Sequence, residues 1–323
     1  MRGEIFLTRF KKHNKLARRS GMISNASQFP GLLSRRQALG YLAGCAAAAI
    51  SACPSIARAS PRKRVVSIGG ALTEILFTLE ADNDLVGVDS TSIYPPRALG
   101  YPNVGYARQL SAEGVLSLRP SHILATEEAG PPAVLKQIAA AGTRITLLPA
   151  KHQYVGLRQR VLGVGRLLER TETAQIVLEQ LDSTWQLVRR QVNAQTAHSL
   201  ARPVRVMFVL AHSPAQMLVA GAKTAAQAML SYAGATNAVQ GFKGYRPLTP
   251  EGLIAAQPDC LLVTEQGLQA AGGFETLFKL PGLEHTPAGL SRAVIAMDAL
   301  RLLGFGPRMP EAVLALHQAL QTV

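Results

Sequence analysis

Cysteine is scarce in this chain, because only three of its 323 residues are cysteines. Cys45 and Cys53 lie within the first 59 residues, and Cys260 falls in the apolar run 260–263. An apolar setting suits a free core thiol better than a disulfide partner. The composition therefore excludes a disulfide scaffold, and a chain of this length can bury enough surface without one.

Acidic residues are nearly missing from the beginning of the chain. Residues 1–59 hold ten Lys and Arg and one acid, Glu4, which accounts for most of the formal net charge of +14. The remaining residues keep 24 basic and 19 acidic side chains, and aromatic residues make up only 5% of the chain. No basic helix carries interleaved aromatics, so the sequence predicts no nucleic-acid binding.

Familiar catalytic motifs are also lacking. The sequence has no Gly-x-Ser-x-Gly elbow, no His-Glu-x-x-His pair and no P-loop. His152, His198 and His285 show no metal-ligand spacing to one another. We therefore expect that the protein is not an enzyme, although an exported enzyme stays a rival interpretation.

The first 59 residues have the pattern of an export signal. Arg35 and Arg36 precede a weakly apolar run over 39–56, and the small-x-small sequence Ala-Arg-Ala follows at 57–59. The paired arginines are typical of a twin-arginine signal, and the alternative is an ordinary Sec signal. Cleavage after residue 59 predicts a periplasmic protein. Lipidation at Cys53 is the other possible processing route.

Strands and helices alternate along the rest of the chain, which predicts an α/β fold with mainly parallel sheets. The region 212–221 is expected to be a loop. The predicted strands cover 64–68, 85–88, 122–125, 144–148, 204–210, 260–263 and 293–297. The predicted helices cover 72–80, 132–141, 157–168, 171–194, 224–233, 274–280 and 310–321.

The helix over 171–194 is long and has one apolar face. Its apolar residues, from Ala174 to Val192, recur at spacings of three and four. We interpret it as a stiff connector between two lobes, while the alternative is one more surface helix of a single domain. The predicted organisation is an export signal at 1–59, an N-terminal lobe at 60–170, the connector at 171–197 and a C-terminal lobe at 198–323.

An internal repeat supports two lobes of one plan. Residues 111–126 read SAEGVLSLRPSHILAT, and residues 249–264 read TPEGLIAAQPDCLLVT. Both contain a helix cap, a Glu-Gly pair, two apolar residues, a proline and an apolar strand that ends in threonine. Just upstream, Arg108 matches Arg246 in the same register. We therefore expect each lobe to present an arginine-bearing loop to a shared cleft.

The chain resembles a known family at several of these points. Two similar lobes and one linking helix are typical of the helical-hinge (class III) periplasmic binding proteins that serve ABC importers. The string Gly-Tyr-Ala-Arg-Gln-Leu-Ser-Ala-Glu-Gly at 105–114 resembles the haem-binding members, as do Ser-Ile-Gly-Gly at 67–70 and Gly-Tyr-Arg-Pro-Leu at 244–248. The resemblance implies a protein that captures haem in a cleft. Cobalamin or a ferric siderophore is the alternative cargo.

The resemblance also implies a site for haem. Tyr106 would be the axial ligand of the iron, a role for which a phenolate is chemically suited. The alternative is a turn tyrosine whose ring packs on the lobe surface. Arg108 or Arg246 would support the phenolate or pair with a haem propionate, and the family pattern favours Arg246 at the phenolate. Further candidate contacts are Tyr245, which could stack on the porphyrin, and His212 and Lys243.

Partners are implied in the same way. The protein would deliver haem to an ABC permease, and an outer-membrane haem delivery system could supply it. Glu74 on the first helix is the candidate acid for docking onto the permease, while the alternative is a solvated helix charge. The matching place in the second lobe holds Ser231, so a second docking acid is missing there.

The export signal makes a direct prediction. We expect the mature protein to begin at or near Ser60, because the Ala-Arg-Ala site ends at residue 59. Mass spectrometry of protein isolated from its native cells measures this. A mature chain that still begins at Met1 would contradict export, and a diacylated Cys53 would contradict only the cleavage site.

Overall fold

The fold was analysed in a computed structural model that describes residues 62–198, 202–213 and 216–323. The predicted export signal lies outside these residues. Ser60–Val323 forms one compact unit. Within the described ranges, no helix is both long enough and apolar enough to cross a lipid bilayer.

The first lobe is built on a parallel sheet of four strands in the order β2-β1-β3-β4. Apolar side chains of β1 and β3 are fully buried, as expected for a sheet covered on both faces. The strands are β1 (Val65–Ile68), β2 (Leu85–Val88), β3 (His122–Thr126) and β4 (Arg144–Leu148). The helices are α2 (Gly70–Thr78), α3 (Ala112–Leu116), α4 (Pro132–Ala140) and α5 (Tyr154–Leu167).

The second lobe has a mixed sheet in the order β10-β9-β5-β6-β8, with β7 also paired to β5. Strands β10, β9 and β5 are parallel, whereas β6 and β8 are antiparallel additions. The strands are β5 (Arg205–Ser213), β6 (Gln216–Ala220), β7 (Thr236–Asn237), β8 (Tyr245–Pro247), β9 (Cys260–Thr264) and β10 (Val294–Met297). The helices are α7 (Ala225–Tyr232), α8 (Pro250–Ala256), α9 (Glu265–Ala270), α10 (Phe274–Leu277), α11 (Pro287–Ser291), α12 (Ala299–Leu303) and α13 (Met309–Leu320).

The predicted loop at 212–221 is wrong. Strand β5 continues through His212, and β6 returns antiparallel to it, with Val209 opposite Val219. Met217 and Val219 pack into the core of this lobe, and Ala220 at the end of the strand is fully buried on the other face. Both faces of this short strand are therefore partly covered, so its residues show no clear alternation in the sequence.

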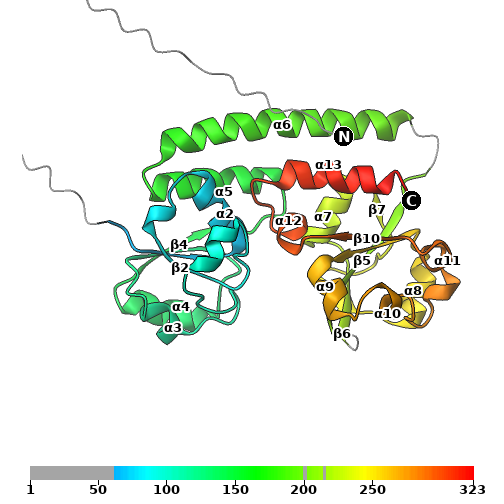
Figure 1. Cartoon of the computed structure of the whole chain (residues 1–323), viewed down its shortest axis with the longest axis horizontal. Coiled ribbons are helices and arrows are strands. Elements are labelled where there is room, and N and C mark those ends of the chain that lie inside the picture. Colours follow the sequence, from blue (N-terminus) through cyan, green and yellow to red (C-terminus); the bar gives the residue numbers. More distant parts are fainter. Residues whose placement is uncertain (1–61, 199–201, 214–215) are drawn as a thin grey trace, which may run out of the picture. The chain divides into compact units, whose positions relative to one another are not determined.

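Helix α6 (Thr171–His198) is a single helix of 28 residues, longer than the predicted 171–194. It runs along α5 of the first lobe and α13 of the second (Figure 1). Trp185, midway along it, stacks on Tyr154 at 4.8 Å between ring centroids and meets the edge of Tyr232 at 4.9 Å. Since Tyr154 belongs to the first lobe and Tyr232 to the second, α6 joins the two lobes through side-chain packing.

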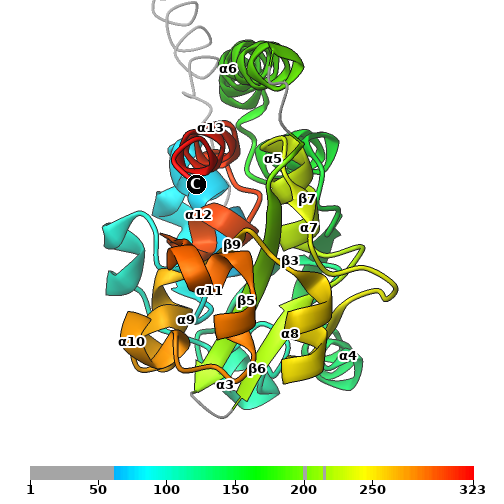
Figure 2. The ribbon, with the colours of Figure 1, turned by 90° about the vertical axis from the view of Figure 1, so that its right-hand side faces the viewer.

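The sequence repeat corresponds to a structural repeat. The Ser111 hydroxyl accepts a hydrogen bond from the Gly114 amide and begins α3, and Thr249 caps α8 through Gly252 in the same manner. The first residues of the two apolar pairs, Val115 and Leu253, are both buried. Each helix leads into a parallel strand that lies between two neighbours, β3 in one sheet and β9 in the other. In Figure 2 the right-hand side of Figure 1 faces the viewer, so the second lobe lies in front.

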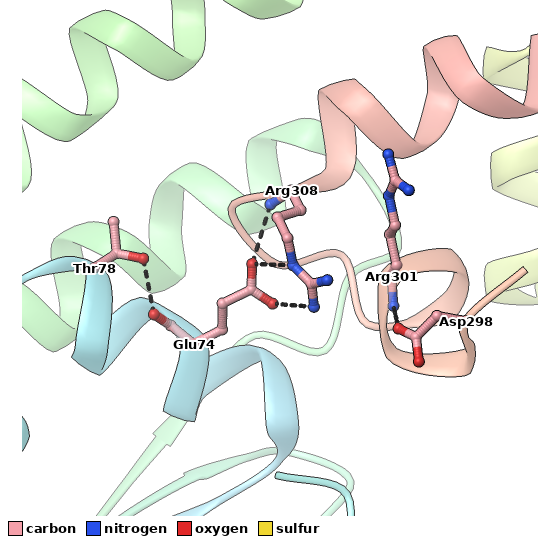
Figure 3. Close-up of polar contacts among 5 residues, drawn as sticks. All are labelled: Glu74, Thr78, Asp298, Arg301 and Arg308. Atoms are coloured by element: carbon pink, nitrogen blue, oxygen red, sulfur yellow. Dashed lines mark hydrogen bonds and ion pairs between the residues drawn. The ribbon is translucent and has the colours of Figure 1, made fainter. Parts of the chain in front are cut away.

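Glu74 is buried rather than free for docking, which corrects the expectation for this residue. Its side chain is 4% exposed, and its carboxylate accepts hydrogen bonds from Arg308 Nε at 2.9 Å and Nη2 at 3.0 Å (Figure 3). The Arg308 amide also donates to it at 3.2 Å, and the guanidinium lies over the ring of Tyr94. The acid of the first lobe is therefore used in an ion pair with the segment between α12 and α13.

A second contact holds the same segment. Arg160 of α5 donates to the carbonyl oxygen of Phe305 at 2.7 Å and to that of Pro149 at 3.0 Å. At Gly306, a Cβ atom would lie 3.2 Å from the Glu74 carboxylate, so a larger residue would crowd the ion pair. Both lobes therefore meet at residues 304–308 through buried polar contacts.

We expect Glu74→Gln to destabilise the protein by about 3 kcal/mol, because it leaves a largely buried guanidinium without its counter-charge. Urea unfolding at neutral pH measures the change. Glu169→Gln is the matched control, since Glu169 is 81% exposed and pairs with Lys63 at the surface. It should barely change stability. Equal effects of the two substitutions would show that the buried pair has no special role.

Candidate functional site

A cavity of about 470 Å³ lies between the two lobes. Four loops of the first lobe form one wall, and each follows the carboxyl end of a parallel strand, where ligands bind in open α/β sheets. The opposite wall is formed by α12, with Ala299 and two leucines, and by Gly304 at its end. The lining residues include Gly69, Gly70, Ser90, Thr91, Thr126, Glu128, Ala150 and His152 from the first lobe, and Gln266, Leu300, Leu303 and Gly304 from the second.

The two glycines after β1 are needed for different reasons, close packing at Gly70 and backbone conformation at Gly69. A Cβ on Gly70 would lie 2.3 Å from the Thr91 carbonyl oxygen and 2.7 Å from Leu300 of the second lobe. Gly69 adopts φ +117°, a conformation that residues with a side chain rarely adopt. The chain therefore passes tightly between two walls of the cavity at this point.

Tyr106 and Arg108, the two central predictions, both line the cavity. They lie in a turn that begins at Gly105 with φ +94° and closes through a hydrogen bond from the Gln109 amide to the Tyr106 carbonyl. Tyr106 is 43% exposed, so its ring is available to a ligand. The loop geometry agrees with the sequence interpretation.

The charge next to Tyr106 belongs to Arg108. The hydrogen bond from Arg108 to Glu128 raises the pKa of the guanidinium, burial lowers it, and the charges of Glu128 and of the Tyr106 oxygen raise it further. Arg108 therefore lies within electrostatic reach of the Tyr106 phenol.

Two residues of the same wall have no role in the sequence interpretation. Glu128 accepts a hydrogen bond from Arg108 with one carboxylate oxygen, and its other oxygen lies 3.9 Å from His152 Nε2. The His152 ring packs on Phe305 at 5.5 Å between centroids. Burial lowers the pKa of His152, Glu128 raises it, and Arg160 and Arg108 lower it. His152 is therefore neutral at neutral pH.

Arg160 is a buried cation at the inner end of the cavity. It is 3% exposed, and its Nε has no hydrogen-bond partner within the described residues. Burial lowers the pKa of Arg160 to about 10, while the charge of Glu128 raises it. No carboxylate pairs with it directly, so it contributes positive potential to the site.

The second-lobe candidates are divided by the pleat of β8. Tyr245 faces the first lobe: burial raises its pKa, the charge of Arg108 lowers it and that of Glu128 raises it. Arg246, the next residue, points to the opposite face of the strand and stacks on Phe242 at 4.6 Å. None of the four second-lobe candidates is among the residues that line the cavity, and His212 is an exposed residue of β5. The four are His212, Lys243, Tyr245 and Arg246.

Glu128, His152 and Arg160 were missed because their signal lies in topology. Glu128 and His152 follow β3 and β4 by two and four residues, at the carboxyl ends of neighbouring parallel strands. That placement could have identified them. The search for metal spacing could not, because the part of the chain that the structure describes has no cluster of three or more His, Cys, Asp or Glu residues fit for a metal ion.

Solved structures of haem-binding proteins are similar to this chain over nearly their whole length. A complex of the periplasmic haem-binding protein BhuT with two haems is 47% identical, with a TM-score of 0.76 over 80% of this chain and 98% of that one. The apo haem-binding protein RhuT from Roseiflexus sp. RS-1 is 39% identical, with the same TM-score and coverage. A periplasmic haem-binding protein from Pseudomonas aeruginosa is 35% identical, with a TM-score of 0.72 over 80% of this chain and 92% of that one.

Curated relatives are more distant. A substrate-binding lipoprotein of an ABC transporter from Bacillus subtilis is 22% identical over 80% of each chain. Vitamin B12-binding proteins of Vibrio cholerae are 31% identical, but over only 28% of this chain and 33% of theirs. The family model described as periplasmic binding protein matches residues 65–300. With two lobes, a long connecting helix and a cavity between them, this chain belongs to the periplasmic binding protein family.

Proposed function

We propose that this protein is an extracytoplasmic substrate-binding protein that captures haem between its lobes and delivers it to an ABC permease. One observation carries the proposal: Tyr106 and Arg108 lie together on the wall of an interlobe cavity, and that wall belongs to a fold shared at 47% identity with a haem-binding protein. As in that family, the activity is binding and transport rather than catalysis.

The chemistry of the cavity suits ferric haem. A phenolate is an established axial ligand of haem iron. A free phenol titrates near pH ~10, so ligation at neutral pH needs help from the ferric ion and from a nearby cation. The position of Arg108 on the same cavity wall as Tyr106 supports Arg108 as that cation. Apolar residues such as Ile93, Leu300 and Leu303 offer surface to the porphyrin.

The other predicted contacts divide into two groups. The stacking of Tyr245 on the porphyrin stays a prediction, which the influence of the Arg108 and Glu128 charges on its pKa supports. The propionate contacts of Arg246 and Lys243 and the ligand role of His212 stay predictions. Arg246 stacks on the ring of Phe242.

Location and partners follow from the same proposal. The protein acts in the periplasm after removal of residues 1–59, or at the membrane surface if Cys53 is lipidated, and an outer-membrane haem delivery system supplies the cargo. Two exposed acids can replace Glu74 as docking contacts: Glu113 of α3 and Glu251 of α8 occupy matching positions of the internal repeat. Both views show α3 and α8 on the side away from α6 (Figures 1 and 2).

Titration with ferric haem tests the proposed ligand. Wild-type protein should show the charge-transfer bands of tyrosinate-ligated iron, and Tyr106→Phe should lose them, because the substitution removes only the oxygen. Some binding should remain, since the arginines and the apolar walls are unchanged. Absorption spectra and the dissociation constant are measured together.

Tyr245→Phe is the matched control, because it removes a phenol oxygen from β8 of the second lobe, outside the residues that line the cavity. It should keep the tyrosinate bands. If Tyr106→Phe behaves as wild type, Tyr106 is not the ligand. Tight binding of cobalamin or a ferric siderophore in place of haem would overturn the cargo.

The docking proposal has its own experiment. We expect the double substitution Glu113→Ala and Glu251→Ala to leave haem affinity unchanged and to reduce haem transport into proteoliposomes that contain the permease, because both charges lie outside the cavity lining. The control is Glu172→Ala with Glu179→Ala, two exposed acids of α6. Equal transport by both double variants would contradict docking through α3 and α8.

A further inference from the structure

Glu128 is an unexpected residue in a cleft for an anionic ligand. It lines the cavity, and its carboxylate would repel the two propionates of haem. It lies in the loop after β3 and accepts a hydrogen bond from Arg108. The Glu128 side chain is 40% exposed and the Arg108 side chain is 58% exposed. An acid that opposes the ligand's charge needs another function in the site.

We propose that Glu128 is a positioning residue, which holds the Arg108 guanidinium on the cavity wall that Arg108 shares with Tyr106, the proposed iron ligand. The inference rests on the proposed haem function and names a residue outside the ligand set predicted from the sequence. Glu128 acts through Arg108 and has no contact of its own with the iron.

The backbone around Glu128 is suited to this task. The Gly130 amide donates to the Ala107 carbonyl at 2.9 Å, and the Leu110 amide donates to the Gly130 carbonyl at 3.0 Å. The loop of Glu128 and the loop of Tyr106 and Arg108 are therefore joined by hydrogen bonds on both sides of Arg108. A carboxylate on one loop can set the direction of a side chain on the other with little freedom between them.

A long arginine side chain needs such a partner. Arg108 is more than half exposed, so without a fixed acceptor its guanidinium would sample many rotamers in water. The Glu128 carboxylate selects the rotamers that keep the guanidinium on the cavity wall, where Tyr106 also lies.

Two other titratable neighbours of Glu128, His152 and Arg160, form no hydrogen bond with its carboxylate. His152 lies 3.9 Å from the second carboxylate oxygen, beyond hydrogen-bond distance, and burial lowers its pKa, so the ring is neutral at neutral pH. Arg160 directs its terminal nitrogens to the carbonyl oxygens of Pro149 and Phe305. Among the described residues, Arg108 is the one cation that forms a hydrogen-bonded pair with Glu128.

Glu128→Gln separates positioning from repulsion, because the two roles predict opposite signs. If Glu128 positions Arg108, the substitution should weaken ferric-haem binding about tenfold, the usual cost of losing an outer partner of a metal ligand. It should also shift the tyrosinate charge-transfer bands. If Glu128 only repels propionates, the substitution should tighten binding and leave the bands unchanged.

A double-mutant cycle tests whether the effect passes through Arg108. In the Arg108→Ala background, Glu128→Gln should cause no further loss of affinity. Glu128→Asp should restore part of the affinity and the wild-type band positions, because it returns the charge on a shorter side chain. Glu127→Gln is the matched control: this adjacent acid accepts a hydrogen bond from the Ala150 amide instead, and its loss should leave haem binding unchanged.

The outcomes distinguish this inference from the proposed function. Wild-type protein without tyrosinate bands would overturn iron ligation by Tyr106 and the positioning role with it. Tyrosinate bands in the wild type, together with unchanged or tighter binding by Glu128→Gln, would overturn the positioning role alone. A loss of affinity that persists in the Arg108→Ala background would also contradict it. Because the Arg108–Glu128 pair is exposed, the variants should unfold at the same urea concentration as wild type.

Discussion

The buried ion pair between Glu74 and Arg308 is the contact on which the geometry of the cleft depends. It joins the first helix of one lobe to the segment that connects α12 and α13 of the other, and Arg160 holds the same segment through the Phe305 carbonyl. Gly304 and Leu303, at the start of that segment, line the cavity. Because an unpaired buried charge is costly, these contacts oppose any motion that would separate the two walls.

The two arginines that line the cleft differ in burial and in pairing. Arg160 is buried and, among the described residues, bonds carbonyl oxygens rather than a carboxylate, whereas Arg108 is more than half exposed and pairs with Glu128. The inner cation provides long-range attraction for an anionic ligand in a region of low dielectric. The Arg108–Glu128 pair carries little net charge, and its proposed role is to orient the Arg108 guanidinium. Under the proposed function, both arginines would contribute to haem affinity, and Arg108 would also affect the iron spectrum.

Local pattern was enough to predict much of this molecule. The caps at Ser111 and Thr249, the strands β2 and β4 and the apolar face of α6 are all set by residues close in sequence, so their prediction was accurate. The β6 strand and the direction of Arg246 were not predictable in this way. Both depend on pairing between β5, β6 and β8, and a shift of one residue in such pairing reverses the face of every side chain.

The sequence by itself determined the α/β class, the two-lobe repeat and the loop that carries Tyr106 and Arg108, because cap residues, apolar periods and glycine turns act over a few residues. Only the tertiary structure decided which charges meet. Glu74 is a helix acid in sequence and becomes a buried partner of Arg308, 234 residues away. Glu128 and His152 come together because β3 and β4 are parallel neighbours that end at the same edge of the sheet. Burial and pairing across such separations are properties of the packed chain, and no local pattern records them.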